Sequence, residues 1–184
     1  LRINGALGGR PDVMGERTSI TLADGRRGMP EGVVLYFENK SETLTAEGEV
    51  PEDGGNGAIL VQGGRVGGGA VCVRDGVPAY DYNFIGMQRF TVEATEKLKA
   101  GKSTIRFEFA YDGGGLAKGG MGTLYVNDEK VGEGRIPRTQ PMVFSADETA
   151  DVGIDLATPV VERIGAERAS KFTGKIPRVT VEVH

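Results

Sequence analysis

Residues 104–126 read TIRFEFAYDGGGLAKGGMGTLYV, and they place two strand-like segments on either side of a glycine-rich run. In the first segment Ile105, Phe107 and Phe109 alternate with charged or small residues, so they share one face of an extended strand. The last four residues, 123–126, are rich in types that favour strands. The glycine run therefore joins two strands, and it predicts a wide hairpin loop.

A phosphate-binding role for the glycine run does not fit its sequence context. A phosphate loop needs a strand, then glycines, then a helix whose N-terminal N–H groups meet the anion. Here a second strand follows, and residues 113–118 (GGGLAK) lack a GKS or GKT ending. We expect glycine to serve backbone geometry instead, through left-handed conformations and close approach of neighbouring chains.

The same alternation recurs elsewhere in the chain. Residues 44–50 (LTAEGEV) and 179–183 (VTVEV) place apolar side chains on one face, whereas residues 58–61 (AILV) are continuously apolar. The continuous run is typical of a strand that is buried on both faces. Two turns, Asp75-Gly76 and the looser Asn127-Asp128-Glu129, predict β-hairpins.

Helical signal is weak throughout the sequence. The best helical window, Pro159–Ser170, has irregular apolar spacing and is interrupted by Gly165, and residues 94–98 fit a strand end and a turn better than a helix. Many short strands with glycine-rich turns predict an all-β domain, a β-sandwich or jelly roll with two antiparallel sheets. We expect one domain over residues 1–184, with a loose start at residues 1–15.

Composition limits the partners of this chain of 184 residues. Its net charge of −4 argues against a nucleic-acid partner, which needs a basic face, and no apolar run is long enough to span a membrane. The single cysteine, Cys72, has no intrachain disulfide partner, so cytoplasm and periplasm both stay open. The start, Leu1, is not a methionine and no secretion signal follows, so we expect a fragment of a longer protein.

An ordered set of short motifs resembles the C-terminal end of large bacterial arylsulfatases, over about residues 14–184. The motifs are GERTS (15–19), GMP (28–30), GGR (63–65), VRDG (73–76), YNF (82–84), FAYDGGG (109–115), GRI (134–136), FSADE (144–148), DVGID (151–155) and FTG (172–174). The resemblance implies a concanavalin/laminin-G-like β-sandwich that packs against the catalytic domain of the same parent chain. Residues 1–15 would be the linker from that domain, and the parent would use formylglycine and calcium.

The resemblance does not extend to a sulfatase active site. The family's catalytic motif is Cys-x-Pro/Ala-x-Arg, whereas Cys72 stands in VCVRD (71–75) with Arg74 only two residues later. We therefore expect no catalytic residue and no cofactor in this chain. Cys72 is interpreted as a small buried thiol in a hairpin strand.

The segment 145–155 (SADETADVGID) is a candidate metal site because it gathers four carboxylates. They belong to Asp147, Glu148, Asp151 and Asp155. Oxygen-rich clusters suit a hard cation, but this spacing does not match a helix-loop-helix calcium loop. The favoured alternative is a structural loop, whose carboxylates accept N–H groups in turns or pair with Arg135 and Arg138.

Two aromatic stripes offer candidate sugar platforms. Residues 80, 82 and 84 form one stripe and residues 107, 109 and 111 form the other, since alternate positions share a face. Exposed stripes stack on sugars, whereas in a sandwich such stripes usually belong to the core. The candidate glycan contacts are Tyr80, Asp81, Tyr82, Asn83 and Arg89.

Three functions follow from these observations. The first is a noncatalytic C-terminal sandwich that supports an arylsulfatase-like sulfuric ester hydrolase. The second is an independent glycan-binding, lectin-like module, which an open groove would favour. The third is a standalone glycoside hydrolase, which would need two facing carboxylates in such a groove.

Overall fold

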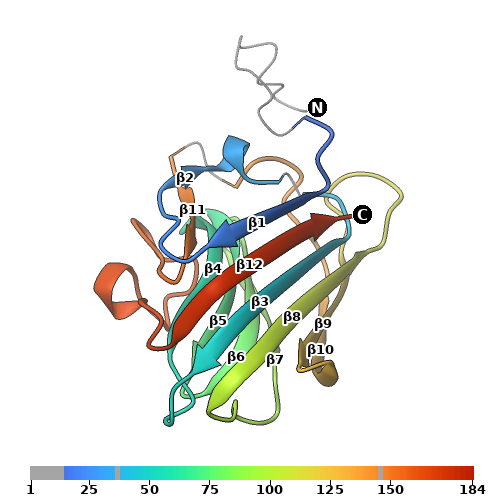
Figure 1. Ribbon diagram of the computed structural model, residues 1–184. Coiled ribbons are helices and arrows are strands. Elements are labelled where there is room, and N and C mark those ends of the chain that lie inside the picture. The colour runs from blue at the N-terminus through green and yellow to red at the C-terminus, as the bar shows by residue number, and fades with distance from the viewer. Residues whose placement is uncertain (1–14, 36–37, 145–146) are drawn as a thin grey trace.

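The computed structural model describes residues 15–35, 38–144 and 147–184, which form two facing six-stranded sheets (Figure 1). The first sheet has the order β1-β12-β3-β8-β9-β10 and the second β2-β11-β4-β5-β6-β7. The elements are β1 (Ser19–Ala23), β2 (Met29–Pro30), η1 (Glu31–Val33), β3 (Glu42–Val50), β4 (Gly57–Gly64), β5 (Gly67–Arg74), β6 (Val77–Phe84), β7 (Gln88–Glu93), β8 (Gly101–Tyr111), β9 (Gly120–Val126), β10 (Glu129–Ile136), β11 (Thr149–Val152), η2 (Glu167–Ala169) and β12 (Lys175–Val183).

Alternation in the sequence translates directly into burial between the sheets. In β8, Ile105, Phe107 and Phe109 are all buried, as predicted from their spacing. Phe107 lies opposite Leu44 of β3 in the strand register and stacks on Tyr80 of the other sheet, with ring centroids 3.7 Å apart. The core is therefore built from inward-facing residues of both sheets.

The hairpin turns use residues that tolerate a left-handed backbone. Asp75 and Gly76 have φ values of 50° and 84°, which match the tight two-residue turn expected there. Asn127 and Asp128 have φ values of 50° and 65°, and Glu129 already belongs to β10. The predicted three-residue turn is thus wrong by one residue, because Asn and Asp together permit the tighter turn.

The glycine-rich run is a hairpin loop between β8 and β9, as its sequence context indicates. Gly113 and Gly114 have φ values of 70° and 72°, in open space. Gly122 plays a different part, since a Cβ atom at this position would lie 2.8 Å from the Phe107 ring. Glycine here provides both a left-handed loop and close packing of strands.

The outer face of the second sheet is covered by the chain between β11 and β12. Val160, Val161 and Ile164 of this covering segment, residues 153–174, pack on small side chains of β4, β5 and β6. The helical window predicted weakly at Pro159–Ser170 contains only the short η2 turn. Cys72 is fully buried in this second core, which confirms its interpretation as a buried thiol, and burial raises its pKa.

The two ends of the described chain lie in neighbouring strands of the first sheet. Strand β1 pairs antiparallel with β12, so Ser19 is opposite Glu182 (Figure 1). The Val183 N–H also donates to the Thr18 carbonyl oxygen at 2.8 Å. Residues 1–14, which hold most of the expected linker, lie outside the described residues.

Candidate functional site

An open hollow of about 420 Å³ lies where the covering segment meets the β5–β6 hairpin. Its lining residues are Asn56, Gly57, Arg74, Asp75, Arg163, Ile164 and Ala169. The volume falls within the usual range of small-molecule pockets. Two guanidinium groups, a carboxylate and an amide thus share a wall with apolar side chains.

The two arginines of the hollow are held in place by one exposed acid, Glu93, and one buried acid, Asp81. Arg74 ends β5, and its side chain is 13% exposed and hydrogen bonded to Glu93. Arg163 comes from the covering segment and donates to Asp81 at 3.1 Å, although its own side chain is 57% exposed. The two guanidinium groups are therefore positioned before any ligand arrives.

Asp81 is the common anchor beneath this hollow. It is 2% exposed, accepts hydrogen bonds from Thr91 and Arg163, and lies 3.9 Å from Arg74. The thiol of Cys72 also donates to it, at 3.5 Å. Asp81, predicted as a polar companion of a sugar, instead orients the arginines from below.

The donors of the hollow are only partly used. The buried Nε of Arg74 has no hydrogen-bond partner among the described residues. The Asn56 side-chain oxygen accepts the Asp75 N–H at 2.6 Å, which fixes the rim of the hollow. The exposed guanidinium group of Arg163, the carboxylate of Asp75 and the apolar Ile164 give the hollow a mixed polar and apolar lining.

Burial favours the core interpretation of the stripe on β6 over the candidate sugar platform. Tyr80 and Tyr82 are 2% and 4% exposed, and the Tyr82 hydroxyl accepts the Gln140 N–H at 2.7 Å. Asn83 is fully buried, and Arg89 pairs with Glu162. The core interpretation of this stripe is right, because β6 faces the opposite sheet and its rings fill the space between the sheets.

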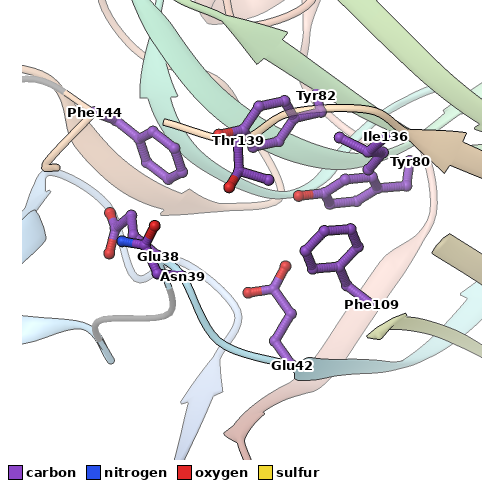
Figure 2. A pocket seen from close by; sticks show the side chains of 9 residues that line it. All are labelled: Glu38, Asn39, Glu42, Tyr80, Tyr82, Phe109, Ile136, Thr139 and Phe144. Carbon is purple, nitrogen blue, oxygen red and sulfur yellow. The ribbon is translucent and has the colours of Figure 1, made fainter. Parts of the chain in front are cut away.

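A second, much smaller cavity of about 20 Å³ lies inside the sandwich (Figure 2). Glu42 reaches from β3 toward Tyr80 on β6, and Glu38 lies on another side of the cavity (Figure 2). Both glutamates are at most 5% exposed. This space holds about one water molecule and does not admit a sugar ring, so it is not the open groove that a glycoside hydrolase would need.

Burial favours the neutral form of both glutamates. It raises the pKa of Glu42 to about 8, although a hydrogen bond with Tyr80 opposes the shift. Burial, and then the neighbouring carboxyl of Glu31, raise the pKa of Glu38 well above its ordinary value. Both carboxyl oxygens of Glu38 and the Oε2 of Glu42 have no hydrogen-bond partner within the described chain.

The acidic segment is anchored over its described residues, 147–155, but it is not a loop throughout, because residues 149–152 form β11. Asp151 is 1% exposed and accepts the Gly28 N–H at 2.6 Å and the Thr149 hydroxyl at 3.0 Å. Asp155 is fully buried and accepts the Val160 N–H at 2.9 Å, and burial raises its pKa to about 7.

The predicted arginine partners of that segment are wrong. Arg135 pairs with Asp112, and the Arg138 guanidinium lies 5.6 Å from the ring centroid of Phe84. Backbone N–H groups and hydroxyls take their place, because the segment contacts β4 and the chain before β2 rather than β10. Over residues 15–35, 38–144 and 147–184, no group of three or more His, Cys, Asp or Glu side chains is placed to hold a metal ion.

No family model and no curated protein matches the chain. Solved structures do resemble it. The Ruminococcus gnavus IT-sialidase CBM40 bound to α2,3-sialyllactose is 13% identical, with a TM-score of 0.56 over 90% of this chain and 89% of that one. The same module with α2,6-sialyllactose is 14% identical, with a TM-score of 0.55 over 90% of each chain. Mouse laminin α1 domains LG4-5 are 12% identical, with a TM-score of 0.48 over 91% of this chain and 39% of that one.

The architecture and the likeness to the two CBM40 structures show the fold of the protein. It is an all-β jelly-roll β-sandwich with two antiparallel sheets, as predicted. At such low identity the likeness establishes the fold alone. The resemblance to the end of arylsulfatases, with its formylglycine- and calcium-dependent parent, stays a prediction. No helix within the described residues is long and apolar enough to cross a membrane.

Proposed function

We propose that this domain is a noncatalytic, glycan-binding module that uses the hollow between the β5–β6 hairpin and the covering segment. The single observation that carries the proposal is the open volume of about 420 Å³ in which Arg74, Arg163, Asn56 and Asp75 converge. Sugars present hydroxyl groups in fixed directions and therefore suit preformed donors and acceptors. Rigid positioning by Asp81 lowers the entropy cost of binding.

The fold likeness suggests which glycans to test first. The sialidase modules of similar fold are bound to α2,3- and α2,6-sialyllactose. A sugar carboxylate would accept hydrogen bonds from a guanidinium group in the bidentate geometry that arginine favours. The exposed Arg163 is the better placed of the two arginines for this contact.

The test is isothermal titration calorimetry of the purified chain with the two sialyllactoses and with lactose, preceded by a glycan array. We expect Arg163→Gln to lower the affinity at least about tenfold, because one charge-assisted hydrogen bond is lost. Arg168→Gln is the matched control, since Arg168 is also exposed on the covering segment but does not line the hollow. No binding to any glycan, or equal losses in both variants, would overturn the proposal.

A second proposal concerns the protein to which the module is attached. The ordered motifs support a parent with an arylsulfatase-like catalytic domain, against which this sandwich would pack. The two proposals are compatible, because a noncatalytic module can bind glycan and support its neighbour. The coding sequence upstream of Leu1 tests the attachment, and the absence of a Cys-x-Pro/Ala-x-Arg motif there would contradict it.

A further inference from the structure

Three exposed apolar side chains project from two adjacent turns at one end of the second sheet. Val66 lies in the β4–β5 turn and is 54% exposed, while Ile85 and Met87 lie in the β6–β7 turn and are 43% and 79% exposed. A Cβ atom on Gly86 would lie 3.0 Å from the Arg65 carbonyl oxygen, so the two turns touch. We call residues 65–66 and 85–87 the double-turn tip.

The double-turn tip is held rigidly from below. The fully buried Asn83 donates its amide to the carbonyl oxygens of Gly64 and Arg65, at 2.8 and 3.0 Å. Its side-chain oxygen accepts the Gly86 N–H at 2.9 Å. One side chain thus ties both turns together, and the apolar residues are presented on a preformed support.

Ile85 adopts a backbone conformation that its side chain disfavours. Its φ value is 45°, and a β-branched residue in this left-handed region is a conformational outlier. Glycine or asparagine would relieve the strain, and neither would present an apolar side chain. Strained residues of this kind cluster at functional positions, because the surrounding structure must maintain them.

Unpaired cations flank the apolar side chains. Arg65 is exposed beside Val66 and forms no ion pair within the described chain. Arg138 is also exposed and lies over the ring of Phe84. Among the described residues, no carboxylate forms a salt bridge with it. The acidic neighbour Glu162 forms its salt bridge with Arg89, and the charge of Arg65 also acts on it.

We propose that the double-turn tip docks on anionic lipid bilayers, with Val66, Ile85 and Met87 in the interfacial layer and Arg65 and Arg138 on lipid phosphates. Apolar side chains beside basic ones are the combination that lies in a membrane interface. A protein partner fits less well, because a stable interface buries about 800 Å² on each side. Three side chains on a protruding tip supply only part of such an area.

The whole chain carries a net charge of −4, so binding depends on this local cationic face and weakens as salt rises. The test is co-sedimentation of the chain with vesicles of phosphatidylcholine and phosphatidylglycerol, compared with phosphatidylcholine alone. We expect the partition coefficient of the mixed vesicles to fall about fivefold in Arg138→Gln. We expect it to fall about tenfold in Met87→Ser, because an inserted apolar side chain is lost.

The matched controls are Met121→Ser and Arg135→Gln, which change an exposed methionine and an exposed arginine paired across β9 and β10 of the other sheet. These should bind vesicles like the original chain, and thermal melting should show all four variants folded. The proposal is overturned if the chain does not co-sediment with the anionic vesicles. It is also overturned if Arg138→Gln and Met87→Ser bind vesicles as well as the original chain does. The same holds if the two control variants lose as much binding as the two tip variants.

Discussion

One buried carboxyl, that of Glu42, links the stability of this sandwich to pH. It belongs to β3 of the first sheet, and its hydrogen bond with Tyr80 reaches β6 of the second. The folded state holds the proton up to about pH 8, whereas an ordinary glutamate releases it near 4.5. Unfolding therefore releases a proton between these values, and stability falls as pH rises from about 4.5 through about 8.

We predict that Glu42→Gln flattens this pH dependence. The amide keeps a hydrogen-bonding group in the cavity but cannot ionise. The decrease of unfolding free energy with pH should therefore become less steep, by up to about 1.4 kcal/mol per pH unit. Urea unfolding at several pH values between about 5 and 8.5 measures this slope for both chains. Glu47→Gln, on the outer face of the same strand, is the control. Parallel slopes for Glu42→Gln and the original chain would contradict the role of Glu42.

The two buried aspartates near β11 should respond differently to amidation. Asp151 accepts bonds from Gly28 and Thr149, so we predict that Asp151→Asn destabilises the domain by about 1–3 kcal/mol. The pKa of Asp155 is raised to about 7, so Asp155→Asn should cost little at neutral pH. Denaturant unfolding compares both with Asp128→Asn, a control at a 91% exposed side chain. Equal losses for Asp151→Asn and Asp128→Asn would refute the anchoring role.

Calcium should leave the melting temperature of the original chain nearly unchanged. The oxygens of Asp151 already accept hydrogen bonds, while a calcium ion needs six to eight oxygen ligands. A cation that bound only the folded state would raise the melting temperature. A steep rise with calcium that disappears in Asp151→Asn would mean that this acidic segment is a metal site rather than a structural one.

At the level of elements, the β8–β9 hairpin contains glycines that are required for two different reasons. Gly113 needs its left-handed backbone in open space, whereas Gly122 packs against the fully buried Phe107. We predict that Gly122→Ala destabilises the domain by about 1–3 kcal/mol, because the ring has no room to move away. The control is Gly32→Ala, in open space with an ordinary backbone. Unchanged stability in Gly122→Ala, measured by urea unfolding, would show that the strands separate easily.

The strands were predictable because burial of one face imposes alternation on the sequence, as in residues 104–111. The covering segment was not predictable in the same way. Val160, Val161 and Ile164 touch the sheet without a helical or strand period, so no local signal marks them as core. Deep burial of Ala58–Val61 was predicted, but the sequence did not indicate which segment covers its outer side.

The candidate site was less predictable than the strands. Arg74 and Arg163 are brought together through Asp81, and the contact between Arg163 and Asp81 spans 82 positions in sequence. Reasoning from spacing found the stripe on β6 and assigned it correctly to the core, but it could not find a hollow formed by distant segments. Packing of the covering segment creates that hollow.

At the scale of the whole molecule, the architecture predicts a β-rich spectrum in solution. The described residues contain only two short 3₁₀ turns and no α-helix. Far-ultraviolet circular dichroism should therefore show well under about a quarter helix, which is near the usual globular average. A higher helical content would mean that the chain folds differently in solution.

The whole chain should also lack sulfatase activity. Cys72 is fully buried, burial raises its thiol pKa, and Arg74 is not placed as in the sulfatase motif. We expect no turnover of a chromogenic aryl sulfate under conditions that convert a sulfatase cysteine to formylglycine. Turnover that is absent in Cys72→Ala would contradict this expectation.

Because β1 pairs with β12, the two ends of the described sandwich lie side by side, and the domain suits insertion into another protein. Thr18 and Val183 are joined by a backbone hydrogen bond, so the polypeptide enters and leaves the sandwich at one corner (Figure 1). Two short linkers would therefore graft residues 18–184 into a surface loop of a host protein without stretching either partner. The same corner allows circular permutation, with new termini opened at the glycine loop of residues 113–115, and a permuted chain should retain its cooperative melting transition.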